Sequence, residues 1–445
     1  MDYQSALDYL YSFVDFEAKP ADVYAPERFN LERVRGLLER LGNPHGRYAS
    51  VHIAGTKGKG SLAAMVESVL RAAGHSTGLF TSPHLQDFRE RIRVDRKMIA
   101  HDSLAALIAE LRPHIPATAD ITFYEISTAL ALEWFARQGV EIAVLEVGLG
   151  GRLDATNVVA PAVCAIMPIS FDHVELLGDT IESIAVEKAG IIKCGVPVVV
   201  APQPVAAQSV LRERTAAIRA PLIDVDAAWA WNCEESSAAG QQFALWPTAR
   251  PQDKCNYQLP LLGTHQVENA AVAVALVQQL REQGWSIPQR AIARGLKTVQ
   301  WPARCEVLPG EPPVMLDCAH NRASARRLAE TLQDFFPGLP RVLVFGAMRD
   351  KDLAGMFAEL LPGCSTAIMT SAGTPRAMRP RDLVQTAAEY DFPTSPAADL
   401  SSALAQAKQA ATPAAVIVVT GSVALAGAVR AAMLEDAALS AGAPL

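Results

Sequence analysis

Short apolar runs alternate with longer amphipathic stretches over most of the first two thirds of the chain. The longer stretches carry apolar residues three or four positions apart, the spacing of one buried helix face, whereas the short runs are typical of buried strands. Strands that alternate with helices in this way form parallel sheets covered by helices. The expected strands lie at 51–54, 77–81, 142–147, 163–169 and 196–201.

The pattern changes twice towards the C-terminus. Between Trp229 and Pro260 the apolar runs are short and mixed with polar and aromatic residues, which predicts an antiparallel insertion before a helix at 267–280. Trp301-Pro302 then interrupts the chain, and a second alternation follows, with strands expected at 314–316, 342–345, 367–370 and 416–420. Because 445 residues exceed one ordinary core, we predict two domains, 1–299 and 300–445.

The composition narrows the class of protein. Hydrophobic residues make up 50% of the chain, yet no apolar stretch is long enough to cross a bilayer and the N-terminus lacks the pattern of a signal peptide. The net charge of -7 argues against a general nucleic-acid binder, since such proteins concentrate positive charge. The seven cysteines include no C-x-x-C pair, as expected of reduced thiols. We expect a cytoplasmic monomer that binds neither membranes nor nucleic acid.

The most specific signal is the segment Gly55-Thr-Lys-Gly-Lys-Gly-Ser61, which joins the first expected strand to an apolar helix. Amides at a helix start bind anions, and in such loops a lysine reaches the outer phosphates while a hydroxyl lies near the metal. The candidate phosphate contacts are Gly58, Lys59, Gly60 and Ser61. The order Gly-Lys-Gly-Ser is unusual, and a strand-to-helix turn that binds nothing is the alternative. With the two alternations, this loop predicts an α/β fold: a P-loop parallel-sheet ATPase domain followed by a smaller Rossmann-like α/β domain.

Three polar residues at the ends of expected strands are candidate metal ligands, namely Ser82, Glu146 and His173. The carboxyl ends of parallel strands form the ligand crevice of a doubly wound sheet, so these side chains should face the phosphate loop. Oxygen ligands suit magnesium, whereas His173 alone favours a softer metal such as manganese or zinc. The alternative for Glu146 is a carboxylate held by backbone amides or by Arg152.

Lys188 falls on the apolar face of a short expected helix, for which Asp179 and Glu182 look like the capping pair. Burial lowers the pKa of an amine and demands a partner. One interpretation is an ion pair with Glu146, Asp172 or a phosphate. The other is that the neutral amine reacts with carbon dioxide, giving a carbamate whose oxygens help to hold a metal.

Further candidates lie towards the end of the first domain and in the second. Asn269 can read an adenine edge through its amide or cap a helix, and its position alone leaves both interpretations open. Arg304 follows the boundary tryptophan, and Asp317 and His320 follow the first expected strand of the second domain. Together they offer a cation, a carboxylate and an imidazole.

Taken in order, these motifs resemble the folylpolyglutamate synthase/dihydrofolate synthase family, within the Mur ligase group. The matches extend over roughly residues 25 to 425 and keep the order of the family. The resemblance is carried by His52 to Ser61, Thr81-Ser-Pro-His-Leu85 with Glu90-Arg-Ile92, Val144 to Asn157, Asp172-His173, Glu187 to Lys193, Gly263-Thr-His-Gln266 with Asn269, Trp301-Pro302 with Arg304, and Asp317 to Asn321.

The resemblance implies a role for each matching position. Lys59 and its loop would hold the phosphates of ATP, and Lys188 matches a lysine that is carbamylated in the family. The implied Mg²⁺ ligands are Ser82, Glu146 and His173, and the implied ATP contacts in the rest of the chain are Asn269, Arg304 and Asp317. His320 lies in the motif near the phosphate and the incoming glutamate, so the candidate catalytic residues are Lys59, Lys188 and His320. The folate side would be lined by Arg28, Phe29, Asn30, Thr122, Phe123, Tyr124, Glu125, Leu153, Asp154 and Ala155.

Two positions depart from the family pattern. Cys318 stands where glycine is usual after Asp317, and Ala303 stands where glycine is common before Arg304. Cysteine lacks the easy access of glycine to positive φ. We therefore expect Asp317 to be displaced if the backbone at Cys318 requires that conformation.

The activity implied by the resemblance is amide formation driven by ATP. A carboxylate attacks the γ-phosphate, and the amine of L-glutamate displaces phosphate from the resulting acyl phosphate. The acceptor would be a folate or dihydropteroate. A ligase that acts on a peptidoglycan precursor would share this mechanism. An ATPase or nucleotide switch would hydrolyse ATP without forming an amide, and a binding protein without activity would only retain ATP affinity.

Overall fold

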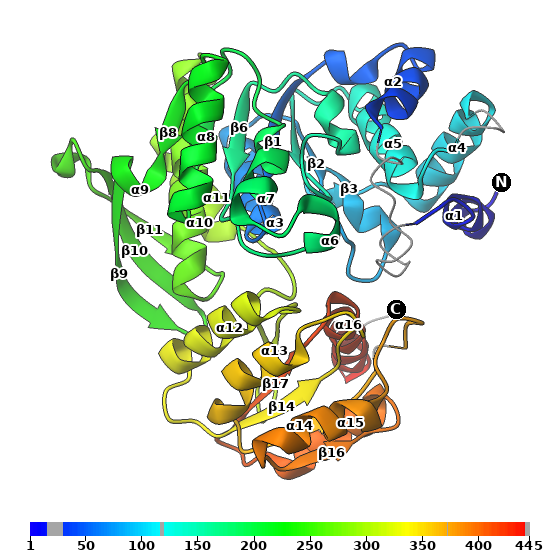
Figure 1. The fold of residues 1–445 in the computed structure, drawn as a ribbon, viewed down its shortest axis with the longest axis vertical. Helices are drawn as coiled ribbons and strands as arrows, with labels where there is room; N and C mark the ends of the chain where they lie inside the picture. The colour runs from blue at the N-terminus through cyan, green and yellow to red at the C-terminus, as the bar shows by residue number, and fades with distance from the viewer. Residues whose placement is uncertain (16–29, 116–119, 372, 441–445) are drawn as a thin grey trace. The chain divides into compact units, whose positions relative to one another are not determined.

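The computed structural model of the protein describes residues 1–15, 30–115, 120–371 and 373–440. The chain divides into two compact units. The first comprises Met1–Cys233, Gln242–Leu259 and Gln266–Val299, and the second comprises Glu234–Gln241, Pro260–His265 and Gln300–Leu445. Two short segments, Glu234–Gln241 and Pro260–His265, thus belong to the second unit although the chain returns to the first unit after each of them. The rest of the second unit follows Val299. Each unit contains a sheet with helices packed on it (Figure 1).

An eight-stranded sheet forms the centre of the first unit, in the order β4-β3-β2-β5-β1-β6-β7-β8. β1 lies between β5 and β6 and runs parallel to both, so that Val51 pairs with Val144 on one side and with Val163 on the other. The strands of the sheet are β1 (Ala49–Ala54), β2 (Thr77–Phe80), β3 (Ile92–Val94), β4 (Lys97–Met98), β5 (Ile142–Glu146), β6 (Val163–Ile166), β7 (Val198–Val200) and β8 (Leu222–Asp224). Only β3 and β4, at one edge, run antiparallel to their neighbours.

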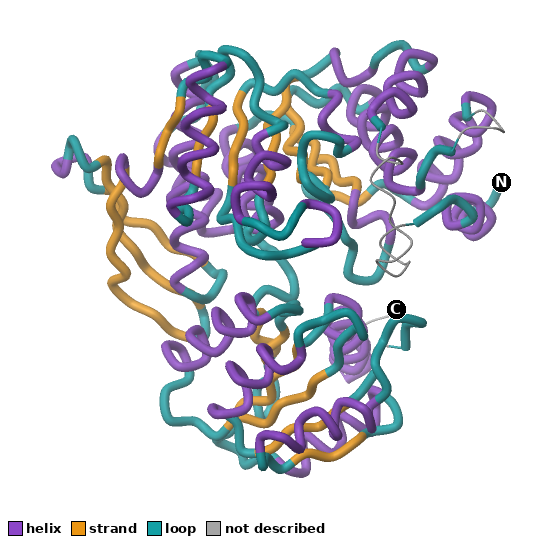
Figure 2. The backbone as a smooth tube through the Cα atoms, viewed as in Figure 1, coloured by secondary structure: helices purple, strands orange, loops and turns teal. Residues whose placement is uncertain are grey.

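Helices cover both faces of this sheet, which explains why β1 is buried from Ser50 to Ala54 (Figure 2). Strands buried on both faces read as continuous apolar runs and not as alternating ones. The α-helices up to residue 298 are α1 (Tyr3–Tyr11), α2 (Leu31–Arg40), α3 (Lys59–Ala73), α4 (His101–Leu111), α5 (Phe123–Arg137), α6 (Val174–Leu177), α7 (Ile181–Ala189), α8 (Val205–Ala217), α9 (Val225–Ala228), α10 (Thr264–Glu282) and α11 (Gln289–Thr298).

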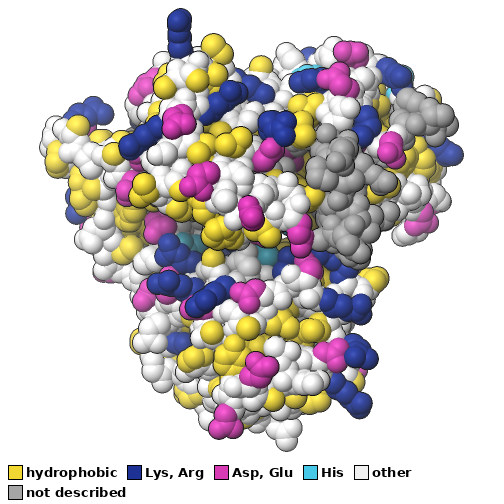
Figure 3. Space-filling view, viewed as in Figure 1, with side chains coloured by type: hydrophobic (Ala, Val, Ile, Leu, Met, Phe, Trp, Pro, Cys, Tyr) yellow, Lys and Arg dark blue, Asp and Glu magenta, His cyan; other side chains and the backbone are white. Residues whose placement is uncertain are grey.

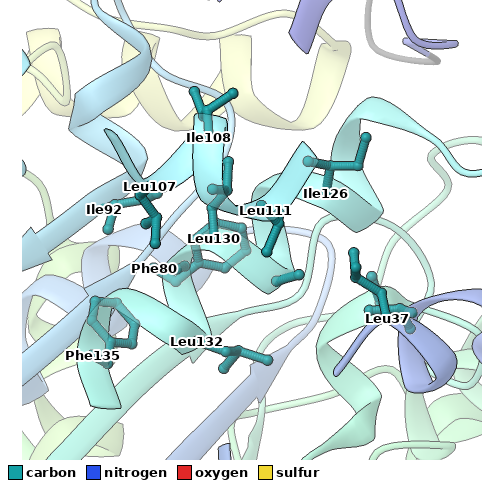
Figure 4. Close-up of a cluster of buried hydrophobic side chains, with 14 of the residues drawn as sticks. Leu37, Phe80, Ile92, Leu107, Ile108, Leu111, Ile126, Leu130, Leu132 and Phe135 are labelled. Atoms are coloured by element: carbon teal, nitrogen blue, oxygen red, sulfur yellow. The ribbon is translucent and has the colours of Figure 1, made fainter. Parts of the chain in front are cut away.

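Two hydrophobic clusters flank the parallel strands. One joins α4 and α5 to β2 and β3 through side chains that point towards one another, among them Leu107, Leu130 and Phe80 (Figure 4). The other joins β6 and β7 to α7 and α8 and includes Ile184, on the same short helix as Lys188. Both clusters fix the strands whose carboxyl ends carry the candidate ligands.

A separate three-stranded sheet, in the order β11-β10-β9, occupies the segment for which the sequence predicts an insertion. Its strands are β9 (Trp229–Ser237), β10 (Gly240–Pro247) and β11 (Cys255–Leu259).

Acidic and basic side chains are interspersed on the face of the molecule seen in Figure 3. Within the described ranges, no helix is both long and apolar enough to cross a membrane.

The second unit contains a six-stranded sheet in the order β12-β13-β17-β14-β15-β16, in which only β12 is antiparallel to its neighbour. The strands are β12 (Glu306–Leu308), β13 (Val314–Leu316), β14 (Arg341–Phe345), β15 (Thr366–Met369), β16 (Thr394–Pro396) and β17 (Val416–Thr420). The α-helices are α12 (Arg322–Phe335), α13 (Leu353–Leu360), α14 (Pro380–Ala387), α15 (Leu400–Ala410) and α16 (Val423–Ser440). The α/β class and the parallel sheets predicted from the sequence are confirmed.

Several edge strands, including β8 and β16, have no counterpart among the sequence predictions. They are short and only partly buried, so they lack the long apolar run that marks a central strand. The predicted cap of α7 is also wrong: Thr180 and Ser183 form the capping box, one residue beyond Asp179 and Glu182. Both pairs have side chains that can cap a helix, and the residue at which the helical backbone begins decides which pair does so.

The first unit contains a close helix contact that depends on one glycine. A Cβ added at Gly295 in α11 would lie 2.5 Å from Cα of Val69 in α3, and the Ser68 hydroxyl donates to the Gly295 carbonyl at 2.8 Å. We expect Gly295→Ala to lower the free energy of unfolding by about 2 kcal/mol, because the helices must move apart. Urea unfolding measures the change.

A matched control is Gly36→Ala in α2, where an added Cβ would meet nothing within 4 Å. Here alanine should raise the free energy of unfolding by about 1 kcal/mol through helix propensity. Equal effects of the two substitutions would contradict this expectation, since an added Cβ meets a close neighbour at Gly295 and none at Gly36.

Candidate active site

The segment that follows β6 supports the glycine-rich loop between β1 and α3. The backbone amides of Thr56 and Lys57 donate to the Pro168 carbonyl at 3.0 and 3.3 Å. The Thr56 hydroxyl donates to the Ser170 carbonyl at 3.2 Å and accepts from the Ser170 amide at 3.1 Å. The residues that follow β6 therefore fix the shape of the loop that follows the neighbouring strand β1.

Two glycines of the loop are required by close neighbours as well as by their positive φ. Gly55 has φ 141°, and a Cβ there would lie 2.5 Å from Cβ of Met167. Gly58 has φ 82°, and a Cβ there would lie 2.6 Å from Oδ1 of Asn269. Gly58 precedes α3 without a side-chain cap, so the first amides of the helix face a position suited to an anion.

Asn269 lies inside α10, which begins at Thr264, so the interpretation of Asn269 as a helix cap is wrong. Its side-chain amide donates to Oε1 of Gln266 at 3.0 Å, and the residue is buried. The same side chain faces Gly58, as the short distance above shows. Asn269 and the glycine-rich loop are therefore neighbours, although they lie far apart in the sequence.

The loop carries an ion pair that the sequence did not single out. Nζ of Lys57 lies 3.1 Å from Oδ2 of Asp172, and Oδ1 of Asp172 lies 3.8 Å from Nε2 of His173. Both partners of the lysine pair are mostly buried, at 26% and 17% exposure. Two sequence signals together could have predicted this pair. One is the second lysine of the glycine-rich loop, and the other is an aspartate that follows β6, the strand next to β1 in the sheet.

Lys188 is 5% exposed and lies in the last turn of α7. Its Nζ donates to the carbonyl of Gly55 at 3.1 Å, which places the amine beside the phosphate loop. Burial, followed by the positive charge of Lys59, lowers the pKa of Lys188 to about 7. Near neutral pH the amine is therefore divided between its charged and neutral forms.

The glycines that follow β5 allow the chain to approach two helices. A Cβ at Gly151 would lie 2.8 Å from the Glu187 carbonyl, and a Cβ at Gly148 would lie 2.6 Å from the Tyr124 ring. Asp154 fixes this loop, because its Oδ2 accepts the amides of Gly148 and Leu149, both at 3.0 Å. Burial raises the pKa of the Asp154 carboxyl.

Two of the predicted metal ligands lie next to each other. Oε2 of Glu146, at the end of β5, accepts a hydrogen bond from the Ser82 amide at 3.2 Å, and Glu146 is 5% exposed. His173, with φ 50°, is the N-cap residue that directly precedes the short helix α6. No cluster of three or more His, Cys, Asp or Glu suited to a metal occurs in the described part of the chain. The donor set fits a cation that takes hydroxyl, water and nucleotide oxygens in addition to one carboxylate.

The residues predicted for the folate side have clear structural contacts. Thr122 and Glu125 form the capping box of α5, and Nε of Arg33 lies 3.1 Å from Oε1 of Glu125. The exposed Asn30 caps α2 by accepting the Glu32 amide at 2.6 Å. The other residues of this set are the buried Phe123 and Ala155, the half-buried Tyr124 and Leu153, and Asp154, whose contacts are given above. Arg28 and Phe29 lie outside the described residues.

Asp317 follows β13 in the second unit and is held by two backbone amides. Oδ2 accepts the Cys305 amide at 3.0 Å, and Oδ1 accepts the Ala319 amide at 2.8 Å. The Cys305 thiol also lies 3.5 Å from Oδ2. Burial raises the pKa of the Asp317 carboxyl, and the positive charge of Arg304 acts in the opposite direction.

The condition for the expected displacement of Asp317 is not met, because the left-handed backbone lies elsewhere and not at Cys318. The left-handed residues here are Ala303 and Cys305, with φ 53° and 48°, which flank Arg304, while Cys318 is not left-handed. An L-residue in this conformation costs roughly 1–2 kcal/mol. The departure that affects the backbone is therefore alanine at 303.

His320 is oriented by a backbone carbonyl. Its Nδ1 lies 2.9 Å from the Cys318 carbonyl, and its amide donates to Oγ of Ser324 at 3.2 Å. A carbonyl only accepts hydrogen bonds, so Nδ1 carries the proton and Nε2 is the basic nitrogen of the neutral ring. The Cys318 carbonyl therefore holds the ring of His320 through Nδ1, and Nε2 is the nitrogen that can accept a proton.

Two family models match the chain, the Mur ligase middle domain over residues 53–277 and the glutamate ligase domain of Mur ligases over residues 303–423. A dihydrofolate synthase/folylpolyglutamate synthase from Bacillus subtilis is 36% identical over 390 residues, which are 86% of this chain and 88% of that protein. A probable bifunctional folylpolyglutamate synthase/dihydropteroate synthase from Haloferax volcanii is 36% identical over 431 residues, and there the chain spans only 49% of the relative.

A solved structure supports the same relationship. The folylpolyglutamate synthase of Mycobacterium tuberculosis complexed with ADP has a TM-score of 0.86 to this chain at 34% identity, and the alignment covers 97% of this chain and 98% of that one. Fold, motif order and sequence identity agree over nearly the whole chain. The chain therefore belongs to the folylpolyglutamate synthase/dihydrofolate synthase family of Mur-type ligases.

Proposed function

We propose that the protein is an ATP-dependent ligase that joins L-glutamate to a carboxylate of a folate or dihydropteroate through an acyl phosphate. The observation that carries this proposal is the arrangement around the phosphate loop. The loop has a fixed shape, a buried lysine donates to its carbonyl, and Glu146 lies beside Ser82 at the adjoining strand ends. These groups suit the transfer of a phosphoryl group to a carboxylate.

The phosphate loop would bind ATP through its backbone and one side chain. The amides of Gly58, Gly60 and Ser61 would contact phosphate oxygens, and Lys59, at the first position of α3, would reach the outer phosphates. Asn269, adjacent to Gly58, would contact the base. From the second unit, Arg304 and Asp317 would bind the nucleotide as well.

Ser82, Glu146 and His173 would hold Mg²⁺, which supplies charge stabilisation to the transferring phosphoryl group when it is bound. Lys188 would carry a carbamate: its neutral nitrogen attacks the carbon of carbon dioxide and loses a proton. The resulting anion would replace a positive charge beside Lys59 with a negative one and add oxygen ligands near the cation. Support comes from the burial of Lys188 and its low pKa.

His320 would act on the incoming amino acid. Because Nδ1 donates to Cys318, Nε2 can accept a proton from the ammonium group of glutamate, which leaves the amine free to attack the acyl phosphate. Asn30, Thr122 to Glu125 and Leu153 to Ala155 would line the folate side, together with Arg28 and Phe29. We also propose that 1–299 and 300–445 form the functional division and that the protein acts as a cytoplasmic monomer.

A substrate panel tests the activity. With ATP, Mg²⁺ and L-glutamate, dihydropteroate or tetrahydrofolate should yield ADP, phosphate and a product heavier by one glutamyl residue, resolved by mass spectrometry. A muramyl nucleotide with amino acids provides the control. Ligation of the muramyl compound alone would favour a peptidoglycan enzyme, and phosphate release without any amide would favour an ATPase.

For Lys188, we expect Lys188→Ala to lower the ligation rate ~100-fold and short carboxylic acids to restore part of it, because they replace the lost carbamate oxygens. Isotopically labelled bicarbonate should give a carbamate signal in the wild type. Since the pKa of Lys188 is about 7, the neutral amine and hence the signal should increase as the pH rises from about 6 to 8.

Lys193→Ala is the matched control, because Lys193 is a partly buried lysine on the same segment and donates to Oδ1 of Asn157 at 2.7 Å. Short carboxylic acids should not affect this variant. A wild-type protein without a labelled carbamate, together with a Lys188→Ala variant that the acids do not restore, would support the ion-pair interpretation.

For His320, we expect His320→Ala to lower kcat ~100-fold, the usual contribution of a positioned base. The rate should be measured at saturating folate and ATP over a range of glutamate concentrations. His114→Ala is the control, because the hydrogen bond of His114 to Arg40 uses its backbone carbonyl and survives the substitution. Full activity of His320→Ala would exclude this residue from the amide-forming step.

A further inference from the structure

The turn that carries Arg304 is connected to the C-terminal helix. Oε2 of Glu306, the first residue of β12, accepts the Ala303 amide at 2.8 Å. Nε of Arg430, in α16, donates to the same carboxylate at 2.9 and 3.1 Å. Glu306 and Arg430 are 22% and 26% exposed, so the pair is partly shielded from water.

A second carboxylate holds the turn from its other side. The Cys305 amide donates to Oδ2 of Asp317 at 3.0 Å. The amides on both sides of Arg304 are thus bound to carboxylates, and both flanking residues, Ala303 and Cys305, have left-handed φ angles. Non-glycine residues keep such a conformation only where their surroundings hold it.

From these contacts we propose that Glu306 and Arg430 are positioning residues for Arg304. Arg430 orients the Glu306 carboxylate towards the Ala303 amide, and that hydrogen bond keeps the backbone of the turn in the conformation that presents Arg304 to the nucleotide. This inference rests on the proposed function, because it requires Arg304 to contact ATP. It assigns to α16 a part in nucleotide binding through two intermediate side chains.

Without Arg430, the Glu306 carboxylate would be drawn towards water, and the turn could relax to more common φ angles. Arg304 would then have to be ordered when the nucleotide binds, and affinity would fall. An ion pair that only stabilises the fold would leave the affinity of the folded protein for nucleotide unchanged. The two possibilities therefore differ in a measurable quantity.

The test measures the Kd of ADP for the full chain by calorimetry. Arg430→Met and Glu306→Gln should each raise Kd about tenfold, which corresponds to ~1.4 kcal/mol. Arg430→Lys, which keeps the charge, should recover part of the loss. Arg326→Met is the control, because Arg326 pairs with Glu330 at 3.0 Å within α12 and has no link to the turn; its Kd should equal that of the wild type.

A double-mutant cycle shows whether the effect passes through Arg304. In an Arg304→Met background, the further change Arg430→Met should leave Kd unaffected, since there is no guanidinium left to position. The KM for ATP should rise in Arg430→Met while the KM for glutamate stays constant. Arg430→Lys and Glu306→Gln are mild enough to keep the test possible if Arg430→Met does not fold.

An unchanged Kd in Arg430→Met and Glu306→Gln would overturn the inference, as would an equal loss with and without Arg304. Binding is measured without turnover, so the proposed function can fail separately. If the wild-type protein binds ADP but forms no amide, the proposed ligase activity is contradicted. The double-mutant cycle on Arg304 and Arg430 can still be interpreted in that case, because it measures binding alone. A wild-type protein that binds no ADP overturns the positioning role.

Discussion

The close approach of two segments to one glycine-rich loop is the constraint on which the site depends. Met167 and Asn269 occupy the space where side chains would lie at Gly55 and Gly58, so the loop cannot change shape without moving the end of β6 or the helix α10. Its backbone also bonds to Pro168. A loop held in this way needs no reorganisation to receive an anion, which is the condition for preorganised electrostatic stabilisation.

Charge is distributed unevenly around this loop. Three lysines, at 57, 59 and 188, lie on the loop or donate to it, and Asp172 pairs with the first of them. Burial and the positive charge of Lys59 lower the pKa of Lys188. Because Lys57 is paired with Asp172 and Lys188 has a low pKa, Lys59 is the lysine of this loop whose charge best suits an anion such as a nucleotide phosphate.

The second unit meets a different constraint. Its Arg304 turn requires left-handed backbone at Ala303 and Cys305, where the chain has no glycine. Carboxylates compensate for the unfavourable conformation by accepting the two amides, one from Glu306 and one from Asp317. The second unit thus uses hydrogen bonds where the phosphate loop of the first unit uses glycine.

Much of this arrangement follows from the sequence, because it depends on local periodicity and on a general rule of parallel sheets. The apolar runs locate the central strands, and the rule that carboxyl ends share one edge brings Ser82 and Glu146 together. The tertiary structure alone decided which residues face each other over long separations: Asn269 against Gly58, Lys57 with Asp172, and Glu306 with Arg430. It also placed the left-handed residues at 303 and 305, since φ at a non-glycine position depends on surrounding contacts that local sequence does not contain.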